Sequence, residues 1–162
     1  YQSPHLLRAA VDQAISKLGS ELHTPPGQWR ALDGGCGTGL AGPELRNLSA
    51  YLVGVDLSEN MVEQARRRAV YDALQVGELS AGVEQSTPLD LFLLADVVVY
   101  IGNLSPLLHA AAPALQERRG LLALTTEKAT GKECAEGKQG WLLTVSGRYA
   151  HCRGYLERAV AE

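Results

Sequence analysis

The chain of 162 residues lacks the features that mark several classes of protein. Its 15 basic and 18 acidic side chains are spread along the sequence and give a net charge of -3, so it has no basic footprint for nucleic acid or an anionic membrane. No apolar run reaches the roughly 20 residues that span a bilayer, and the amino terminus has neither the basic start nor the apolar middle of a signal peptide. The composition predicts a soluble protein without a nucleic-acid or membrane signal.

Signs of a metal site or a disulfide framework are also missing. The four histidines have no metal-ligand spacing, so no metal site is predicted. The three cysteines are an odd number, also without ligand spacing, and this favours a reducing interior over a disulfide framework. We therefore expect a cytoplasmic protein. The four histidines are His5, His23, His109 and His151, and the three cysteines are Cys36, Cys134 and Cys152.

A hydrophobic content of 46% is enough for one core, and the length is too short for two ordinary domains. We expect a single domain over residues 1–162, with an amino-terminal helix (1–20), a cofactor-binding core (29–126) and a flap with a carboxyl-terminal segment (127–162). In the first part, apolar residues recur at the spacing of one helix face, Ser3 and Pro4 suit its start, and Gly19 suits its end.

Strand-like and helix-like stretches alternate through the core, which predicts an α/β fold of the Rossmann-like type, a mostly parallel sheet with helices on both faces. The expected strands are Trp29–Leu32, Tyr51–Val55, Leu74–Val76, Leu89–Leu94 and Gly120–Thr126; the expected helices are Leu40–Leu48, Ser58–Ala69 and Ser105–Gln116, where Pro113 could end the last one early. Beyond the core we expect a surface loop or mobile flap at Thr130–Gly140, a strand at Trp141–Val145 and a helix at Cys152–Val160.

The most informative stretch is the glycine-rich run Leu32–Gly39, which follows one predicted strand and precedes a predicted helix. Glycines there let the backbone turn sharply and approach a ligand closely. Asp56 follows 17 residues after Gly39, at the tip of the next apolar strand, where a carboxylate can accept hydrogen bonds from both hydroxyls of a ribose. The combination predicts a cofactor that contains adenosine.

Two adenosine cofactors fit the glycine spacing. Residues 37–42 match the dinucleotide pattern G-x-G-x-x-G, so an NAD-dependent oxidoreductase is one alternative. Asp33, directly before the glycines, would repel a pyrophosphate but attract an ammonium group. S-adenosylmethionine carries an ammonium and a sulfonium and no phosphate, so Asp33 favours it.

On these residues, with Val53–Ser58 and Met61, the chain resembles class I S-adenosylmethionine-dependent methyltransferases. The resemblance implies that Asp33 holds the methionine ammonium, often through water, that Asp56 binds the ribose, and that Met61 covers one adenine face. It further implies that Glu78 accepts from the adenine amino group and that the transferable methyl lies near Asp96. The full expected cofactor site is Asp33, Gly35, Cys36, Gly37, Gly39, Asp56, Leu57, Met61, Glu78, Leu79 and Asp96.

Further stretches, among them residues 36–43, 96–104 and 146–151, are similar to the methyltransferase-like domains associated with tetratricopeptide-repeat proteins. The sequence departs from the pattern of this family at two points. Gly34 occupies a position where Leu or Val is usual, and we expect a sheet that lacks the last two antiparallel strands. The second departure leaves open a catalytically incomplete S-adenosylmethionine-binding or assembly-type module.

The acceptor is the least determined part. The sequence offers no dedicated acid–base pair, so Asp96, Tyr100 and His151 are the candidate catalytic residues, and Tyr100, Arg148, Tyr149 and His151 are candidates for acceptor recognition. Cys36 is interpreted as a packing residue rather than a nucleophile. With no basic surface and no peptide-binding repeat, we expect methyl transfer to a small molecule, with a protein acceptor as an alternative.

Overall fold

The computed structural model describes residues 2–135 and 138–161. Its centre is a five-stranded sheet in the order β3-β2-β1-β4-β5, and every neighbouring pair is parallel. The strands are β1 Trp29–Gly34, β2 Ser49–Asp56, β3 Ala73–Val76, β4 Leu91–Leu94 and β5 Leu121–Leu124. The α/β prediction is confirmed, with strand bounds that differ from the expected ones by a few residues.

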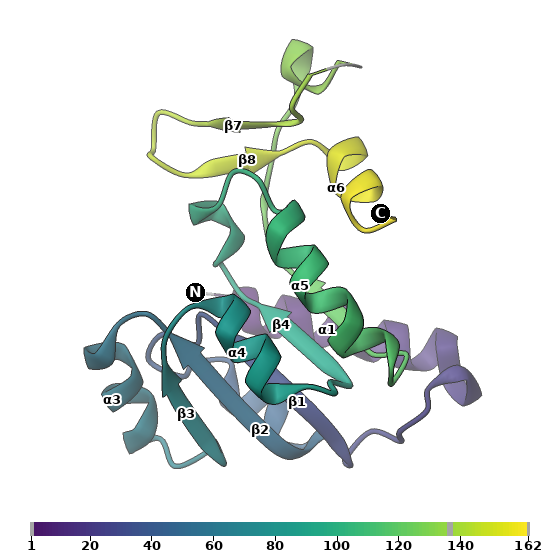
Figure 1. Cartoon of the computed structure of the whole chain (residues 1–162), viewed down its shortest axis with the longest axis vertical. Coiled ribbons are helices and arrows are strands. Elements are labelled where there is room, and N and C mark those ends of the chain that lie inside the picture. The colour runs from purple at the N-terminus through teal and green to yellow at the C-terminus, as the bar shows by residue number, and fades with distance from the viewer. Residues whose placement is uncertain (1, 136–137, 162) are drawn as a thin grey trace.

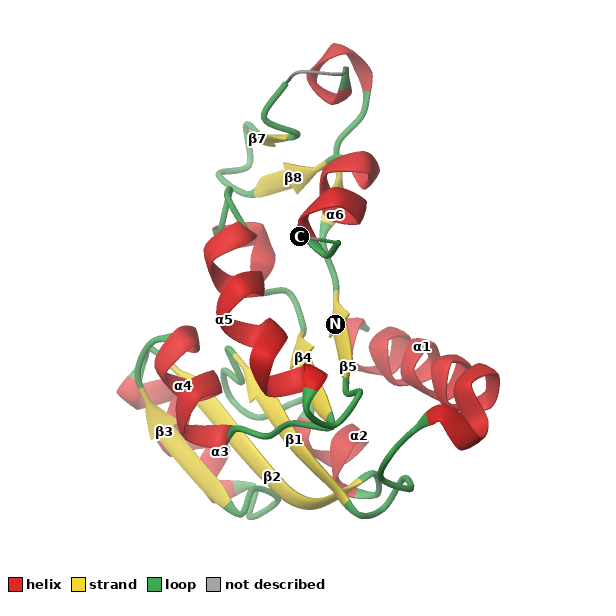
Figure 2. Ribbon diagram, turned by 45° about the vertical axis from the view of Figure 1, so that its right-hand side comes forward, coloured by secondary structure: helices red, strands yellow, loops and turns green. Residues whose placement is uncertain are grey.

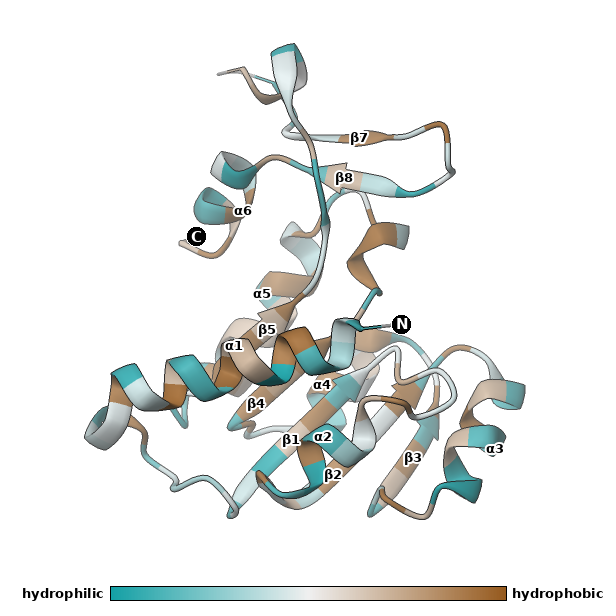
Figure 3. Cartoon of the chain, turned by 180° about the vertical axis from the view of Figure 1, so that it is seen from behind, coloured by the Kyte–Doolittle hydropathy of each residue, from teal (hydrophilic) through white to brown (hydrophobic). Residues whose placement is uncertain are grey.

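Helices cover both faces of this sheet (Figures 1 and 3). On one face α1 (Ser3–Leu18) and α2 (Gly42–Arg46) pack through Leu7, Val11 and Leu45. On the other, α4 (Leu79–Ser86) and α5 (Ser105–Gln116) form the larger core. Helix α3 (Glu59–Arg67) packs beside β2 and β3. Because β4 is covered on both sides, its four residues are all apolar and buried.

Local sequence signals explain most helix ends. Pro4 stands in the first turn of α1, and Ser58 caps α3 by accepting a hydrogen bond from the Met61 N–H at 3.4 Å. Pro113 does not end α5, because a buried apolar face holds the helix on both sides of it. Helix α2 is shorter than the expected Leu40–Leu48, since the loop continues through Ala41 and the helix ends at Arg46.

The carboxyl-terminal segment forms a second, three-stranded sheet in the order β6-β8-β7, which stands at one end of the molecule (Figure 2). It contains β6 Glu127–Lys128, β7 Trp141–Leu143 and β8 Tyr149–His151, followed by α6 Arg153–Ala159. The β7–β8 pair is antiparallel. Short 3₁₀ turns lie at Gly19–Glu21 (η1), Val98–Tyr100 (η2) and Gly131–Cys134 (η3). Sequence analysis missed α4, β6 and β8.

The expectation of no disulfide is wrong. Cys134 in η3 is bonded to Cys152 just before α6, 18 residues further on, with their Cα atoms 5.4 Å apart. The odd cysteine count misled because the third residue, Cys36, is free and buried elsewhere, inside the glycine loop. The bond also ties the expected Thr130–Gly140 flap to the start of α6; residues 136–137 of that flap lie outside the described residues.

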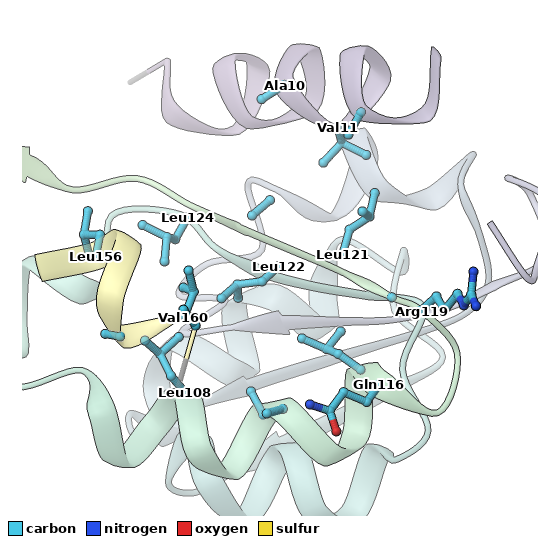
Figure 4. A pocket seen from close by; sticks show the side chains of 18 of the residues that line it. Ala10, Val11, Leu108, Gln116, Arg119, Leu121, Leu122, Leu124, Leu156 and Val160 are labelled. Carbon is cyan, nitrogen blue, oxygen red and sulfur yellow. The ribbon is translucent and has the colours of Figure 1, made fainter. Parts of the chain in front are cut away.

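The β5 edge of the main sheet is open. Among residues 2–135 and 138–161, no strand pairs with the free side of β5. Beside this edge lies an apolar groove of about 1000 Å³, lined by α1, α5, β5 and α6, with Leu121, Leu122 and Leu124 along it (Figure 4).

No helix in the described part of the chain is both long and apolar enough to cross a bilayer.

Candidate active site

A cleft of about 930 Å³ lies at the carboxyl ends of β1 to β4. This size is within the roughly 300–1,000 Å³ of small-molecule sites, and the carboxyl ends of parallel strands are where α/β sheets bind ligands. Most of the expected residues line it: Gly35, Gly37, Asp56, Leu57, Met61, Glu78, Leu79, Asp96, Tyr100 and Arg148. Asp33, Cys36, Gly39, Tyr149 and His151 are not among its lining residues.

The loop after β1 explains why its glycines are needed. Gly35 has φ +64°, and a Cβ there would lie 2.5 Å from Cγ2 of Val97. Gly37 has φ +53°, but a Cβ on it would meet nothing within 4 Å. The loop therefore passes tightly over the end of β4 at Gly35 and leaves open space at Gly37, beside the cleft.

Asp56 connects this loop to the tip of β2. Its Oδ2 accepts a hydrogen bond from the Gly37 N–H and its Oδ1 accepts one from the Ser58 N–H, both at 2.9 Å. A carboxylate oxygen has two lone pairs, so each oxygen can accept one further bond. The backbone thus fixes the orientation of Asp56 and leaves acceptor capacity for two hydroxyl groups in the cleft.

Asp33 lies beneath the glycine loop rather than in the cleft. It is 1% exposed, and the Tyr71 hydroxyl donates a hydrogen bond to its Oδ2 at 2.6 Å. Burial raises the pKa of Asp33 to about 7; the Tyr71 bond opposes this rise and the charge of Asp56 adds to it. Its contact with the methionine ammonium stays a prediction, and the burial fits the water-mediated form of that contact.

Cys36 and Gly39 also support the loop from below. Burial, followed by the nearby charges of Asp33 and Asp56, raises the pKa of the Cys36 thiol far above neutral, so the thiol is not an activated nucleophile. At Gly39, with φ +79°, a Cβ would lie 3.0–3.2 Å from atoms of Tyr71, Arg68 and Ala65. Both residues pack the loop against its neighbours.

At the end of the cleft nearest β3, two apolar side chains are unusually exposed to solvent. Leu57 is 66% exposed and Met61 is 41% exposed. Glu78 and Leu79 face the same cleft at the start of α4, and the Gly77 N–H donates to the Asp56 carbonyl oxygen at 2.9 Å. Exposed apolar surface next to a carboxylate suits a flat ring with an amino group.

At the β4 end, Asp96 is held from several sides. It has φ +57°, which is uncommon for a residue other than glycine. Ser3 Oγ donates to its Oδ2 at 2.9 Å, the Thr125 hydroxyl donates to its Oδ1 at 3.3 Å, and its own N–H donates to Thr125 Oγ1 at 2.8 Å. Tyr100, on η2, is 69% exposed over this end of the cleft.

His151 is buried away from the cleft. Its Nδ1 lies 2.6 Å from Thr126 Oγ1, and its Nε2 lies 3.0 Å and 3.1 Å from the carbonyl oxygens of Ile101 and Gly102. It is 1% exposed, and both ring nitrogens have partners. This arrangement makes His151 an anchor for the loop after η2 rather than a base within reach of a ligand in the cleft. Tyr149 packs edge-on against Trp141.

Sequence analysis missed three contributors to this site. Tyr71 partners Asp33, and Asn103 lines the same cleft as Asp96 and Tyr100. Tyr155 holds this part of the cleft, since its hydroxyl accepts from the Leu104 N–H at 2.7 Å and donates to Asn103 Oδ1 at 3.1 Å. No local pattern marks Tyr71 and Tyr155, because both bond to residues that are distant in sequence, whereas Asn103 also accepts from the nearby Ser105 N–H. The described residues contain no cluster of three or more His, Cys, Asp or Glu that could hold a metal ion.

A parallel sheet with a glycine loop after its first strand and a carboxylate at the tip of the second defines a Rossmann-like cofactor-binding protein. Comparison with known proteins places it more narrowly. The model of the methyltransferase domain family matches residues 31–124, more than half of the chain, and the chain belongs to this family.

Curated relatives share the same domain. A ubiquinone biosynthesis O-methyltransferase of Caulobacter sp. (strain K31) is 31% identical over 145 residues, which cover 85% of this chain and 57% of the relative. Methyltransferase-like protein 27 of Homo sapiens is 36% identical over 131 residues, 75% of this chain and 50% of the relative. The chain thus spans about half the length of these curated relatives.

Solved structures agree on the fold. The N-terminal domain of EvdMO1 with bound S-adenosylhomocysteine has a TM-score of 0.68 at 16% identity, and the match covers 99% of this chain and 71% of that one. Magnesium protoporphyrin IX methyltransferase from Synechocystis PCC 6803 with bound S-adenosylmethionine has a TM-score of 0.57 at 19% identity, with 95% and 66% covered. The association with tetratricopeptide repeats stays a prediction.

Proposed function

We propose that this chain binds S-adenosylmethionine in the cleft at the carboxyl ends of β1 to β4 and transfers its methyl group to a small molecule. The observation that carries this proposal is Asp56, which is oriented by the Gly37 and Ser58 N–H groups and keeps acceptor capacity toward the cleft. Membership of the methyltransferase domain family supports the same cofactor over NAD.

The side chains around the cleft fit the parts of this cofactor. Asp56 would accept from the ribose hydroxyls, Leu57 and Met61 would cover the adenine, and Glu78 would accept from its amino group. The open space at Gly37 leaves room for the ligand to lie on the backbone. Bound S-adenosylmethionine supplies a methyl group on a sulfonium, whose departure as a thioether needs no activation by the protein.

The main task of the protein is then alignment. Holding an acceptor atom in line with the methyl group can lower the activation barrier by roughly 7–11 kcal/mol. Asp96 and Tyr100 lie at the end of the cleft where an acceptor would enter. Asp96 would position the acceptor or take its proton, whereas His151 is too deeply buried to do so.

A small-molecule acceptor is supported by the names of the relatives, which refer to ubiquinone biosynthesis and to magnesium protoporphyrin IX. The sequence-wide net charge of -3 supplies no basic surface for nucleic acid. A protein acceptor is the second candidate class, because an exposed side chain such as Tyr100 can also contact a peptide.

The proposal is tested by incubating the protein with methyl-tritiated S-adenosylmethionine and a panel of small phenols, carboxylic acids and amines. Enzymatic transfer gives labelled product that scales with protein concentration and that excess S-adenosylhomocysteine suppresses. The Asp56→Ala variant should lose most of this product, while Asp12→Ala, which changes an exposed carboxylate on α1, should keep it. Cofactor binding without any labelled product, from this panel or from a peptide library, would instead identify a binding module.

A further inference from the structure

The acceptor end of the cleft combines an apolar wall with two polar side chains. Tyr100, Ile101, Pro106 and Leu107 supply the apolar part, and Asn103 and Arg148 the polar part. All six line the same cleft as the expected cofactor residues. The inference below rests on the proposed function, because it treats this end as the place where the methyl acceptor binds.

Arg148 has donors without hydrogen-bond acceptors. It lies in the turn between β7 and β8, where its Nε is 2.8 Å from Glu127 Oε1 and its Nη2 is 3.7 Å from Asp96 Oδ1. The closer contact lacks the alignment of a hydrogen bond, and Nε is buried. The longer contact exceeds hydrogen-bond reach. Among the described residues, none accepts a well-formed hydrogen bond from this guanidinium, which carries five N–H groups.

Asn103 presents donors in the same way. Its Oδ1 accepts from the Ser105 N–H and from the Tyr155 hydroxyl, both at 3.1 Å. Because a backbone N–H can only donate, this bond identifies the oxygen of the amide and leaves its NH₂ group without a hydrogen-bond acceptor in the described part of the chain. Asp96, the carboxylate at this end of the cleft, accepts from Ser3 and Thr125 and lies beyond hydrogen-bond reach of Arg148, with its Oδ1 3.7 Å from Nη2.

The end of the cleft where the methyl acceptor would bind therefore offers N–H groups, on Arg148 and Asn103, to which no residue in the described part of the chain accepts a hydrogen bond. A buried donor without an acceptor, such as the Arg148 Nε, costs free energy, and a guanidinium is shaped to bind two oxygens of one planar anion; the NH₂ group of the exposed Asn103 can bind water or a ligand. We propose that Arg148, with Asn103, is a specificity-determining residue that selects a methyl acceptor bearing a carboxylate on a flat apolar body. The apolar body would lie against Tyr100, Pro106 and Leu107.

Two acidic groups face Arg148 and oppose this selection. Glu127 approaches from β6 and Asp96 from the end of β4, and both are partly exposed, with 40% and 31% of their side chains accessible. Their charges hold the guanidinium in place and lower its attraction for a further anion. Solvent screens such exposed charges, whereas two hydrogen bonds from a fixed guanidinium are short-ranged. Selection of a carboxylate would thus come from the geometry of these bonds. Arg148→Lys keeps the charge but not this geometry, so it should not keep the full preference for the carboxylate.

The test compares matched ligands on protein saturated with S-adenosylhomocysteine. Benzoate and benzamide, and phenylacetate and phenylacetamide, differ within each pair only in a carboxylate or a carboxamide. Their dissociation constants are measured by saturation-transfer NMR titration on the wild type, Arg148→Gln and Arg148→Lys. Arg153→Gln is the matched control, because Arg153 lies in the same segment but pairs with Glu157 on the exposed side of α6.

The wild type and Arg153→Gln should bind each acid at least tenfold more tightly than its amide. Arg148→Gln should lose this preference and Arg148→Lys most of it, while the affinity of all variants for S-adenosylhomocysteine stays within twofold and shows that they are folded. Equal binding of acid and amide by the wild type, a preference that survives Arg148→Gln, or no saturable binding of any probe would overturn the inference and leave the proposed function standing. Failure to bind S-adenosylhomocysteine would overturn both.

Discussion

Replacing Asp33 by asparagine should remove a pH dependence of stability that the wild type carries. The carboxyl group has a pKa of about 7 in the folded chain, against an ordinary value of 3.8, because it is buried beneath the glycine loop. Between these values the folded state holds a proton that the unfolded state has released. The contribution of Asp33 to stability is therefore greatest at low pH, falls as pH rises from about 4 to 7, and is level above that.

The size of this effect follows from the two pKa values. Over the whole window it amounts to about 4 kcal/mol, and between pH 5 and pH 8 to about 2–3 kcal/mol. An asparagine side chain keeps the shape and an oxygen that accepts from the Tyr71 hydroxyl, but it does not titrate. The difference in stability between Asp33→Asn and the wild type should therefore grow in favour of the variant as pH rises, which isolates Asp33 from every other titrating group.

The assay is urea unfolding at pH 5 and pH 8, followed by tryptophan fluorescence, to which Trp29, 1% exposed, and Trp141 contribute. For a chain of this size, the expected difference also corresponds to about 5–10 °C in melting temperature. A wild type and variant that differ by the same amount at both pH values, within about 0.5 kcal/mol, would refute the assignment of a raised pKa to a buried Asp33.

Three further predictions concern the loop, the sheet and the cofactor. Gly35→Ala should cost about 2–5 kcal/mol in urea unfolding, because its Cβ would clash with Val97, whereas Gly37→Ala, with open space, should cost about 1–2 kcal/mol. The pKa of Asp72 is lowered, since bonds from the Leu52 N–H and Arg46 outweigh its burial; Asp72→Asn should cost about 1–2 kcal/mol at pH 7, and this loss should vanish as pH falls below the folded-state pKa. Met61→Ala should weaken S-adenosylhomocysteine binding about three- to tenfold by calorimetry and leave the melting temperature within about 2 °C, because the side chain is 41% exposed in the free protein.

The parts of the fold that local patterns determine could be predicted from the sequence. Apolar runs flanked by turns located the five strands of the main sheet, and the glycine loop with Asp56 located the cleft. Helix α4 was missed because Leu79–Ser86 has Gly82 at its centre and no clear apolar period. Gly82 is needed there because a Cβ would lie 2.9 Å from Val55, a contact that only the folded chain reveals.

The contacts that the sequence did not indicate, at the site and in the carboxyl-terminal segment, have the same origin. The position of Asp33 before the glycines does not reveal that the bond to Tyr71, 38 residues away, holds it below the cleft, and its contact with the methionine ammonium, often through water, stays a prediction. The Cys134–Cys152 bond depends on how η3 and β8 come together, which an odd cysteine count does not indicate. His151 is a common type of catalytic residue, yet its three partners on Thr126, Ile101 and Gly102 bury it.

We expect the binding of an adenosyl cofactor to depend most on Asp56, at the tip of β2. The most direct measurement is a calorimetric titration with S-adenosylhomocysteine of the wild type, Asp56→Ala and the exposed-carboxylate control Asp12→Ala, with NAD titrated in parallel. We expect micromolar binding to the wild type, a loss of tenfold or more in Asp56→Ala, a change of less than twofold in Asp12→Ala, and no binding of NAD at the same concentrations. Equal affinity of Asp56→Ala and the wild type, or binding of NAD without S-adenosylhomocysteine, would contradict the proposed cofactor site.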